Sequence, residues 1–264
     1  KIMLKVENIY KTFNPNTINE KKALNGVSLT LNDGDFVTVI GSNGAGKSTL
    51  LNAIAGIWPI DEGKIMIDEH DITKLKDFQR AKYIGRVFQD PMTGTAATMW
   101  IEENMALAKR RGKNRGLKIG IEDKERQEYK ELLKQLDLGL ENRLTTKVGL
   151  LSGGQRQALT LLMATMQKPR LLLLDEHTAA LDPKTANKVL EITDKLIKEN
   201  NLTTFMVTHN MKDALKYGNK IIMMCDGKII FEAEGKEKEK LTVQDLLNKF
   251  DTAGGVVSDS MMLG

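Results

Sequence analysis

One short stretch restricts the fold more than any other part of the sequence. It reads Gly41-Ser42-Asn43-Gly44-Ala45-Gly46-Lys47-Ser48-Thr49, between the apolar β-branched run Phe36–Ile40 and the helical run Leu50–Ile57. The spacing is that of a phosphate-binding loop, G-x-x-x-x-G-K-[ST], in the strand–loop–helix setting that such a loop requires. A strand buried on both faces belongs in the middle of a sheet. The stretch therefore predicts an α/β fold with a phosphate site after a central strand.

The residue types of this loop also predict its ligand. Glycine at 41, 44 and 46 lets the backbone wrap around β-phosphate oxygens. Lys47 can neutralise the β- and γ-phosphates, and the Ser48 hydroxyl can ligate Mg²⁺. The loop is therefore expected to hold a nucleotide and its magnesium ion.

A second turn, Leu151-Ser152-Gly153-Gly154-Gln155, has the pattern of an anion-binding helix start. Two consecutive glycines expose backbone N–H groups, and the apolar run Ala158–Met163 that follows predicts a buried helix. The chain has one complete phosphate loop, so a phosphate at this turn would come from a second copy of the chain. The alternative is a capped helix start without a ligand.

Two acids end a strongly apolar strand. Leu171–Leu174 is followed by Asp175 and Glu176, at the carboxyl end where parallel sheets bind their ligands. Asp175 is expected to hold Mg²⁺, and Glu176 to orient or deprotonate an attacking water. The alternative is that both acids cap the next turn.

Two further strands end in polar groups that suit the same site. Gln89 follows the strand Ile84–Phe88, and its amide can point into a site at the sheet edge. His209 follows the strand Thr203–Thr208 and is expected to face the γ-phosphate. A solvated loop glutamine and an ordinary surface or capping histidine are the alternatives.

An aromatic residue near the start can stack on an adenine ring. Phe13 is the favoured candidate and Tyr10 the second, because any aromatic face would serve. The alternative is that either ring packs at a strand end.

The rest of the pattern alternates short strands with amphipathic helices. Strands are expected at 4–9, 27–31 and 63–72, a hairpin at 221–231, and helices at 101–109, 122–137, 184–199 and 243–250. Residues 91–147 are expected to form a small helical subdomain. Its basic run Lys109–Lys118 carries six positive charges and no acid; it could touch nucleic acid or lipid, but its glycines favour a solvated loop.

Composition limits the classes of function. The chain has 264 residues, enough for one large domain or a domain with a subdomain, and a single cysteine, Cys225, which excludes a disulfide framework and suits the cytosol. A net charge of +4 does not by itself indicate nucleic acid. No apolar run reaches the roughly 18 residues of a membrane span, and Lys1–Lys5 lacks a signal-peptide core, so a membrane role is expected to be peripheral.

Together these stretches resemble the ATP-binding-cassette (ABC) ATPases over nearly the whole chain. Residues 151–155 match the signature motif of that family letter for letter, and they lie between the phosphate loop and the Asp175-Glu176 strand, as in the family. The resemblance implies a P-loop NTPase core with a mixed, mainly parallel central sheet, an antiparallel β subdomain and an inserted α-helical subdomain. It divides the chain into 1–90 (β subdomain and Walker A part), 91–165 (helical subdomain with the signature) and 166–264 (the rest of the core).

The resemblance also implies roles for single positions. Gly41–Thr49 corresponds to the Walker A loop, and Gln89 to the Q-loop glutamine that senses Mg²⁺ and the transmembrane partner. Asp175 corresponds to the Walker B aspartate and Glu176 to the catalytic glutamate. Asp182 corresponds to the D-loop aspartate, His209 to the switch histidine and Phe13 to the adenine-stacking aromatic. In the family, two cassettes close head to tail on two ATP, each held by one Walker A loop and the other signature. Ser152, Gly153, Gly154 and Gln155 would then contact the nucleotide of a second copy.

The resemblance finally implies cofactors, partners and location. ATP and Mg²⁺ are the expected cofactors, and a second copy, a polytopic membrane permease and a solute-binding protein the expected partners, on the cytoplasmic side of the membrane. The sequence from Asp175 to Asp182 resembles that of an importer-type branch in which the ATPase is a separate chain. Transport of an amino acid or another small solute would suit such a branch. His177 departs from the proline that most often follows the catalytic glutamate.

Two other functions compete with this one. A soluble cassette protein acting on ribosomes or DNA is disfavoured, because such proteins usually carry two cassettes or a long coiled coil between the Walker motifs. A regulatory module without turnover is disfavoured because Glu176 and His209 are both present.

Overall fold

The structure, a computed structural model, describes residues 1–111 and 120–254. These residues form two compact units. The first contains residues 1–84 and the segment from Asn201 onward, and the second contains residues 85–200.

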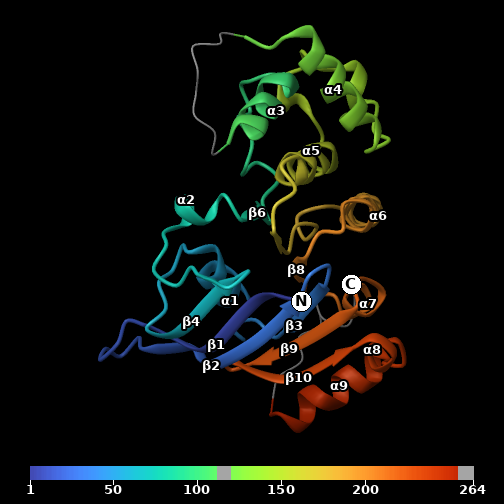
Figure 1. Cartoon of the computed structure of the whole chain (residues 1–264). Coiled ribbons are helices and arrows are strands. Elements are labelled where there is room, and N and C mark those ends of the chain that lie inside the picture. The colour runs from blue at the N-terminus through green and yellow to red at the C-terminus, as the bar shows by residue number, and fades with distance from the viewer. Residues whose placement is uncertain (112–119, 255–264) are drawn as a thin grey trace. The chain divides into compact units, whose positions relative to one another are not determined.

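An antiparallel sheet opens the first unit (Figure 1). It consists of β1 (Ile2–Phe13), β2 (Lys21–Asn32), β4 (Glu62–Ile67) and β5 (His70–Asp71), in the order β2-β1-β4-β5. The two early strands are longer than the apolar pattern predicts, because backbone pairing continues through polar residues as far as Phe13 and Lys21, with register irregularities as between Val6 and Ile9.

A second sheet of the first unit places the phosphate loop. β3 (Phe36–Gly41) lies between β8 (Thr204–Val207) and β9 (Lys220–Cys225) and pairs parallel with both. Every residue of β3 and β9 is buried, which explains why both strands are apolar apart from Thr38 and Lys220. β10 (Lys228–Glu234) pairs antiparallel with β9 through the turn Asp226-Gly227, where both residues have positive φ, as the predicted hairpin requires.

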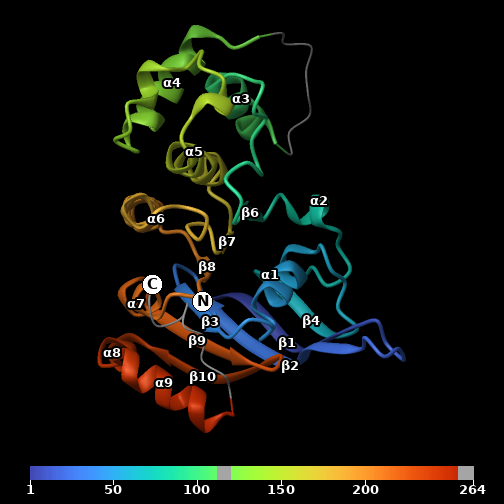
Figure 2. The same ribbon diagram turned by 180° about the vertical axis from the view of Figure 1, so that it is seen from behind.

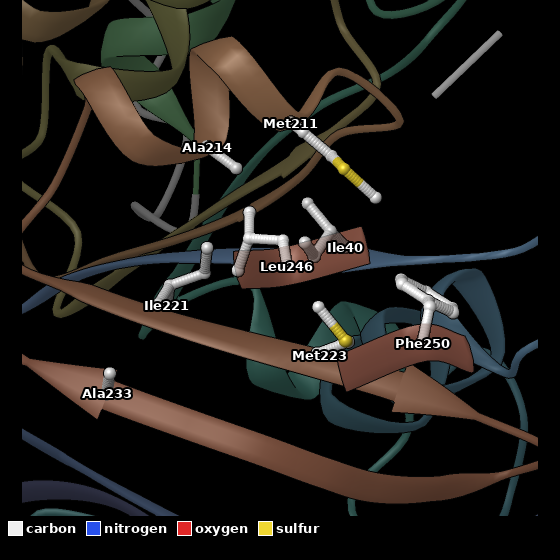
Figure 3. Packing of buried hydrophobic residues seen from close by; sticks show 8 residues of the cluster. All are labelled: Ile40, Met211, Ala214, Ile221, Met223, Ala233, Leu246 and Phe250. Atoms are coloured by element: carbon white, nitrogen blue, oxygen red, sulfur yellow. The ribbon is translucent and has the colours of Figure 1, made fainter. Parts of the chain in front are cut away.

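The described residues of the first unit form five helices beside these sheets. They are α1 (Lys47–Ala55), α2 (Asp77–Arg80), α7 (Met211–Lys216), α8 (Gly235–Glu239) and α9 (Val243–Thr252). Figure 3 shows the apolar side chains of α7, α9 and the strands gathering into one cluster, with Leu246 and Phe250 of α9 near Met223 and Ile40. This burial explains why the last helix follows the apolar spacing that the sequence predicts.

The second unit is mainly helical. Its strands β6 (Ile84–Val87) and β7 (Leu171–Asp175) are neighbours, and its helices are α3 (Ile101–Arg110), α4 (Asp123–Lys134), α5 (Gly153–Thr165) and α6 (Pro183–Asn200), with 3₁₀ turns at Leu140–Asn142 and Val148–Leu150. Figures 1 and 2 show α3, α4 and α5 together, as their mutual contacts require. Tyr129 and Leu133 of α4 are fully buried, which confirms the apolar face predicted for this helix.

The observed elements confirm the predicted fold class, an α/β P-loop fold with an antiparallel sheet and a helical part. The sequence pattern missed α2, α7 and α8, because four to six residues are too few for a helical period to show. The predicted division of the chain at 90 and 165 stays a prediction. The two compact units are a different division, with boundaries after residues 84 and 200. Within the described residues, no helix is long and apolar enough to cross a membrane.

Candidate nucleotide site

The phosphate loop follows β3 and leads directly into α1. Glycine is required at two of its positions by close backbone approach. A Cβ at Gly41 would lie 2.5 Å from the Met224 carbonyl oxygen, and one at Gly46 2.5 Å from the Ala23 carbonyl oxygen. Gly46 also has a φ of 102°, a left-handed conformation that disfavours other residues. The loop therefore has the tight glycine cradle that a phosphate site needs.

The lysine of the loop is folded back onto it. Lys47 is only 5% exposed, and its Nζ donates hydrogen bonds to the carbonyl oxygens of Gly41, at 2.7 Å, and Ser42, at 3.2 Å. Gly46 contributes no side-chain cap to α1, and an uncapped helix N-terminus favours an anion. The loop thus places the Lys47 ammonium group beside the positive end of the α1 dipole, and both favour a nucleotide phosphate.

His209 lies at the same sheet edge as this loop. β3 and β8 run parallel, with Val39 opposite Val207, so the residues after each strand share one edge. The backbone N–H of Thr208 donates to the Val39 carbonyl oxygen at 3.0 Å. Asn210 then caps α7 with its side-chain oxygen, so His209 occupies the link between strand and helix. The first unit therefore brings the predicted histidine to the edge that carries the cradle.

The two aromatic candidates for the adenine both make contacts within the first unit. Phe13 packs edge to face on Trp58, with ring centroids 5.0 Å apart, and Lys11 Nζ lies 5.6 Å from the Phe13 ring. The Tyr10 hydroxyl lies against Gly26. Packing at the strand end is therefore observed for Phe13, whereas Tyr10 is 38% exposed, and adenine stacking by Phe13 stays a prediction. Trp58, which lies in the turn after α1, was not predicted to contact Phe13, because no local pattern marks this pair.

The second unit places Asp175 beside an arginine that sequence reasoning missed. Arg86 Nη2 of β6 lies 3.7 Å from Asp175 Oδ2, and both side chains are largely buried. Its guanidinium stacks over Phe88 at 4.6 Å, and burial lowers the pKa of Arg86 while the Asp175 charge opposes that shift. The ion pair fits an ionised carboxylate at the predicted metal ligand. A charged residue inside an otherwise apolar strand was the available signal.

The residues next to Gln89 and Glu176 are joined by a buried amide. Gln157 of α5 donates from Nε2 to the Phe88 carbonyl oxygen at 2.7 Å and to the His177 carbonyl oxygen at 2.5 Å. Phe88 precedes Gln89, and His177 follows Glu176. The second unit therefore brings the ends of β6 and β7 together, as the predicted site requires. Sequence reasoning missed Gln157.

His177, which departs from the family pattern, is a core residue. It is 1% exposed, and its Nε2 lies 3.0 Å from Thr193 Oγ1 of α6. Burial lowers the pKa of His177 to about 4, so the ring is neutral near pH 7. The imidazole thus anchors the turn after Glu176 to α6.

The signature turn is a capped helix start. Ser152 Oγ accepts from the Gln155 N–H, and Gln155 Oε1 accepts from the Ser152 N–H, which forms a capping box at the start of α5. Ser152 and Gly153 are nevertheless exposed, so their polar groups can reach a ligand. The structure confirms that this turn begins a helix, and the phosphate role of Ser152, Gly153, Gly154 and Gln155 stays a proposal.

Asp182 also acts as a helix cap. Its Oδ1 accepts from the Thr185 N–H at 3.1 Å at the start of α6, and hydrogen bonds from Thr185 hold the pKa of Asp182 below its usual value. Its predicted nucleotide contact is not tested by this arrangement.

The predicted magnesium ligands fit the ion in type. Ser48, Gln89 and Asp175 are oxygen ligands with one carboxylate, and Mg²⁺ is typically held by one or two carboxylates together with substrate phosphates. Over residues 1–111 and 120–254, no group of three or more His, Cys, Asp or Glu could hold a metal by itself. The residues present are therefore compatible with magnesium bound together with a nucleotide.

The basic run falls partly outside the described residues. Lys109 pairs with Glu128 at 2.5 Å, and Arg110 pairs with Glu125 at 3.0 Å. Residues 112–118, which carry the other predicted contacts with nucleic acid or lipid, lie outside. The charges of Lys109 and Arg110 serve the α3–α4 contact.

A phosphate loop between a parallel strand and a helix in the first unit, and two acids after a buried strand in the second, are the parts of a P-loop NTPase. Comparison with known proteins narrows this class, because the ABC transporter family matches residues 24–179. A tyrosine transport ATP-binding protein of Clostridioides difficile is 47% identical over 252 residues, which cover 95% of this chain and 100% of that protein. The chain belongs to the ABC transporter family and is an ATPase of that family.

Two further comparisons agree with this assignment. The energy-coupling factor transporter ATP-binding protein EcfA2 of Clostridium acetobutylicum is 35% identical, over 94% of this chain and 82% of that protein. The dimeric post-hydrolysis structure of the ATP-binding cassette MJ0796, bound to ADP and Pi, has a TM-score of 0.74 and 33% identity, over 88% of this chain and 98% of that one. ATP binding and hydrolysis are therefore properties of this chain's class.

Proposed function

We propose that the chain is the ATP-hydrolysing subunit of a membrane transporter that imports a small solute. Two copies would close head to tail on two ATP molecules and drive a polytopic permease from the cytoplasmic side of the membrane. A solute-binding protein is a further expected partner. An amino acid is the favoured cargo class.

One observation carries the dimer part of the proposal. Within the described residues, the phosphate loop at Gly41–Thr49 contains the lysine, and the glycine-rich turn at Ser152–Gly154 begins a helix without one. Lys47 is folded into the first turn, whereas the second turn is exposed at Ser152 and Gly153 and has a capping box instead of a lysine. A second copy's cradle would supply the phosphate that the second turn suits.

The proposed chemistry divides among named residues. Lys47 and the loop amides bind the β- and γ-phosphates, and Ser48, Gln89 and Asp175 hold the metal. Mg²⁺, when bound, neutralises charge on the phosphate oxygens. Phe13 is proposed to contact the adenine, and Asp182 to contact nucleotide near the dimer contact.

Two residues are proposed to carry the hydrolytic step. Glu176 orients the attacking water and takes its proton, a contribution worth roughly 10² to 10⁴ in rate. His209 contacts the γ-phosphate as charge develops there. No described residue contact favours the alternative of a cassette that acts on ribosomes or DNA.

The relatives support the transporter and cargo parts. The protein that is 47% identical over nearly the whole chain is a tyrosine transport ATP-binding protein, and the EcfA2 relative is a transporter subunit. An amino acid cargo therefore agrees with the name of this tyrosine transport relative.

Two substitutions test the proposal directly. Lys47→Ala should abolish ATP binding in a titration at low micromolar nucleotide, because it removes the phosphate-neutralising ammonium. Glu176→Gln should bind ATP, lose turnover and accumulate as a dimer in gel filtration. Lys64→Ala and Glu131→Gln, which change exposed lysine and glutamate side chains, are the matched controls.

The outcomes separate the parts of the proposal. Unchanged ATP binding by Lys47→Ala would reject the cradle, and wild-type turnover by Glu176→Gln would reject the base. Recovery of a polytopic membrane protein with the chain from native membranes would support the transporter role, and recovery of ribosomes instead would reverse it.

A further inference from the structure

Gln157 is the buried residue that contacts both catalytic strand ends of the second unit. Its side chain is fully buried, and its Nε2 donates to the carbonyls of Phe88 and His177. These carbonyls belong to the residues directly adjacent to Gln89 and Glu176. One amide thus fixes the backbone beside two proposed site residues.

The backbone that Gln157 holds is conformationally unfavourable. Glu176 has a φ of 45°, in the left-handed region, which costs on the order of 1 kcal/mol for a residue with a Cβ. Such a conformation persists only where the surrounding contacts determine it. Three contacts do so here: the Ala179 N–H donates to the Glu176 carbonyl oxygen at 2.9 Å, Gln157 holds the next carbonyl, and Thr193 holds the His177 ring.

The amide also carries a cost that packing alone does not explain. Gln157 Oε1 is buried and has no hydrogen-bond partner among the described residues. A buried acceptor without a partner is unfavourable. An apolar side chain would avoid that cost, so the two donated bonds are the reason for an amide at this position.

The amide is attached to the helix that begins at the signature turn. α5 starts at Gly153, and Gln157 lies just over one turn further along it. A displacement of the N-terminal turn of α5 would therefore move the amide and, through its two bonds, the backbone beside Glu176 and Gln89.

We infer that Gln157 is a positioning residue that sets the Glu176 carboxylate and the Gln89 amide by holding the neighbouring carbonyls, and that it ties their placement to α5. The inference rests on the proposed role of Glu176 as the hydrolytic base. It gives the signature helix a direct link to the catalytic group of its own chain.

Gln157→Met tests this role, because methionine keeps the length and approximate volume and removes both donors. ATPase turnover should fall about 10- to 100-fold, as expected when a catalytic group is displaced by roughly 1 Å. The KM for ATP and the affinity of the monomer for ATP should stay within about twofold, because the residues that bind phosphate are elsewhere.

Asn104→Leu is the matched control. Asn104 is also a fully buried amide of the second unit, and its Nδ2 donates to the carbonyls of Ala96 and Trp100, away from the catalytic strands. Its loss should lower the melting temperature and leave kcat within about twofold of wild type. Equal losses of kcat in the Gln157 and Asn104 variants would overturn the inference.

A second measurement separates positioning from damage to α5. The double variant Gln157→Met with Glu176→Gln should still form the ATP-bound dimer in gel filtration, because closure does not need a positioned carboxylate. Loss of that dimer, when Glu176→Gln alone forms it, would show that α5 itself is disturbed and would reject the inference. Gln157→Asn, which keeps the amide on a shorter side chain, should show an intermediate kcat and serves if the methionine variant does not fold.

The failures of the two proposals are distinguishable. Turnover by Glu176→Gln would remove the proposed base, whatever Gln157 does. Loss of turnover in Glu176→Gln with wild-type kcat in Gln157→Met would leave the base in place and reject only the positioning role.

Discussion

At the scale of single residues, burial decides which groups carry unusual chemistry. His177 stood out in the sequence as a departure, and the structure shows it as a neutral ring buried against Thr193. The sequence pattern marked Arg86 as one residue of a strand, and the structure shows that it forms an ion pair with Asp175. In both cases the residue type was visible in the sequence, and its environment was not.

Lys238 is another buried charge, and it predicts a pH dependence of stability. Its side chain is 4% exposed, and its Nζ donates to the carbonyl oxygens of Tyr217 and, at 2.9 Å, Gly218. Burial lowers the pKa of Lys238 to about 8. Between that pH and the unfolded value of about 10.4, the unfolded chain binds more protons than the folded one, so stability should rise with pH.

The Lys238→Met variant isolates this effect. In urea unfolding, the free energy of unfolding of wild type relative to this variant should increase between about pH 7.5 and 10, by up to about 3 kcal/mol. Lys236→Met changes an exposed neighbour and should show no such trend. A pH-independent difference between wild type and Lys238→Met would contradict the prediction.

At the scale of elements, the close contact between α5 and α6 requires glycine at position 154, in addition to any contact of that position with a ligand. A Cβ at Gly154 would lie 2.2 Å from Thr185 Cγ2, and one at Gly153 3.1 Å from Leu181 Cδ2. A side chain at Gly154 would overlap α6, and one at Gly153 would crowd the turn Thr178–Asp182. Glycine leaves room for both contacts, while Ser152 and Gly153 stay exposed to a ligand.

Gly154→Ala tests this packing. Alanine normally stabilises a helix interior relative to glycine by about 1 kcal/mol, but overpacking here should outweigh that gain and destabilise by about 1–3 kcal/mol. Thr185→Ser removes the methyl that would clash and keeps the hydroxyl. In that background, Gly154→Ala should become neutral or stabilising, as measured by thermal unfolding of all four proteins. Equal destabilisation in both backgrounds would refute the packing explanation.

At the scale of the whole molecule, the proposed function requires two copies. The exposed turn at Ser152 would contact nucleotide held by another chain, so turnover per chain should rise with protein concentration before it levels off. A concentration-independent rate over the range where gel filtration shows monomers would contradict the dimer.

Ser152→Arg should separate nucleotide binding from hydrolysis. Arginine keeps the position exposed and adds bulk at the proposed contact, while the cradle at Gly41–Thr49 is untouched. Monomer affinity for ATP should stay within about twofold and turnover should fall at least about tenfold. Normal hydrolysis by this variant would show that the turn serves only as a helix cap.

Much of the site was accessible from the sequence, because its parts are short local patterns. The phosphate loop, the Asp175-Glu176 strand end and the turn at residues 151–155 each depend on residues adjacent in the chain, and the structure forms the expected strand or helix at each. Local hydrogen bonding and burial of a β-branched run suffice to determine such units.

The tertiary structure decided the rest. Residues far apart in the chain meet only after folding, and no sequence period marks them: Gln157 bonds to residues 69 positions before it and 20 after it, and Phe13 packs on Trp58. The left-handed backbone of Glu176 likewise follows from contacts that neighbouring elements impose. The sequence by itself determined the chemistry proposed for the site, because local motifs specify it. Tertiary packing decided how the groups of the site are held, because burial and long-range hydrogen bonds exist only in the folded chain.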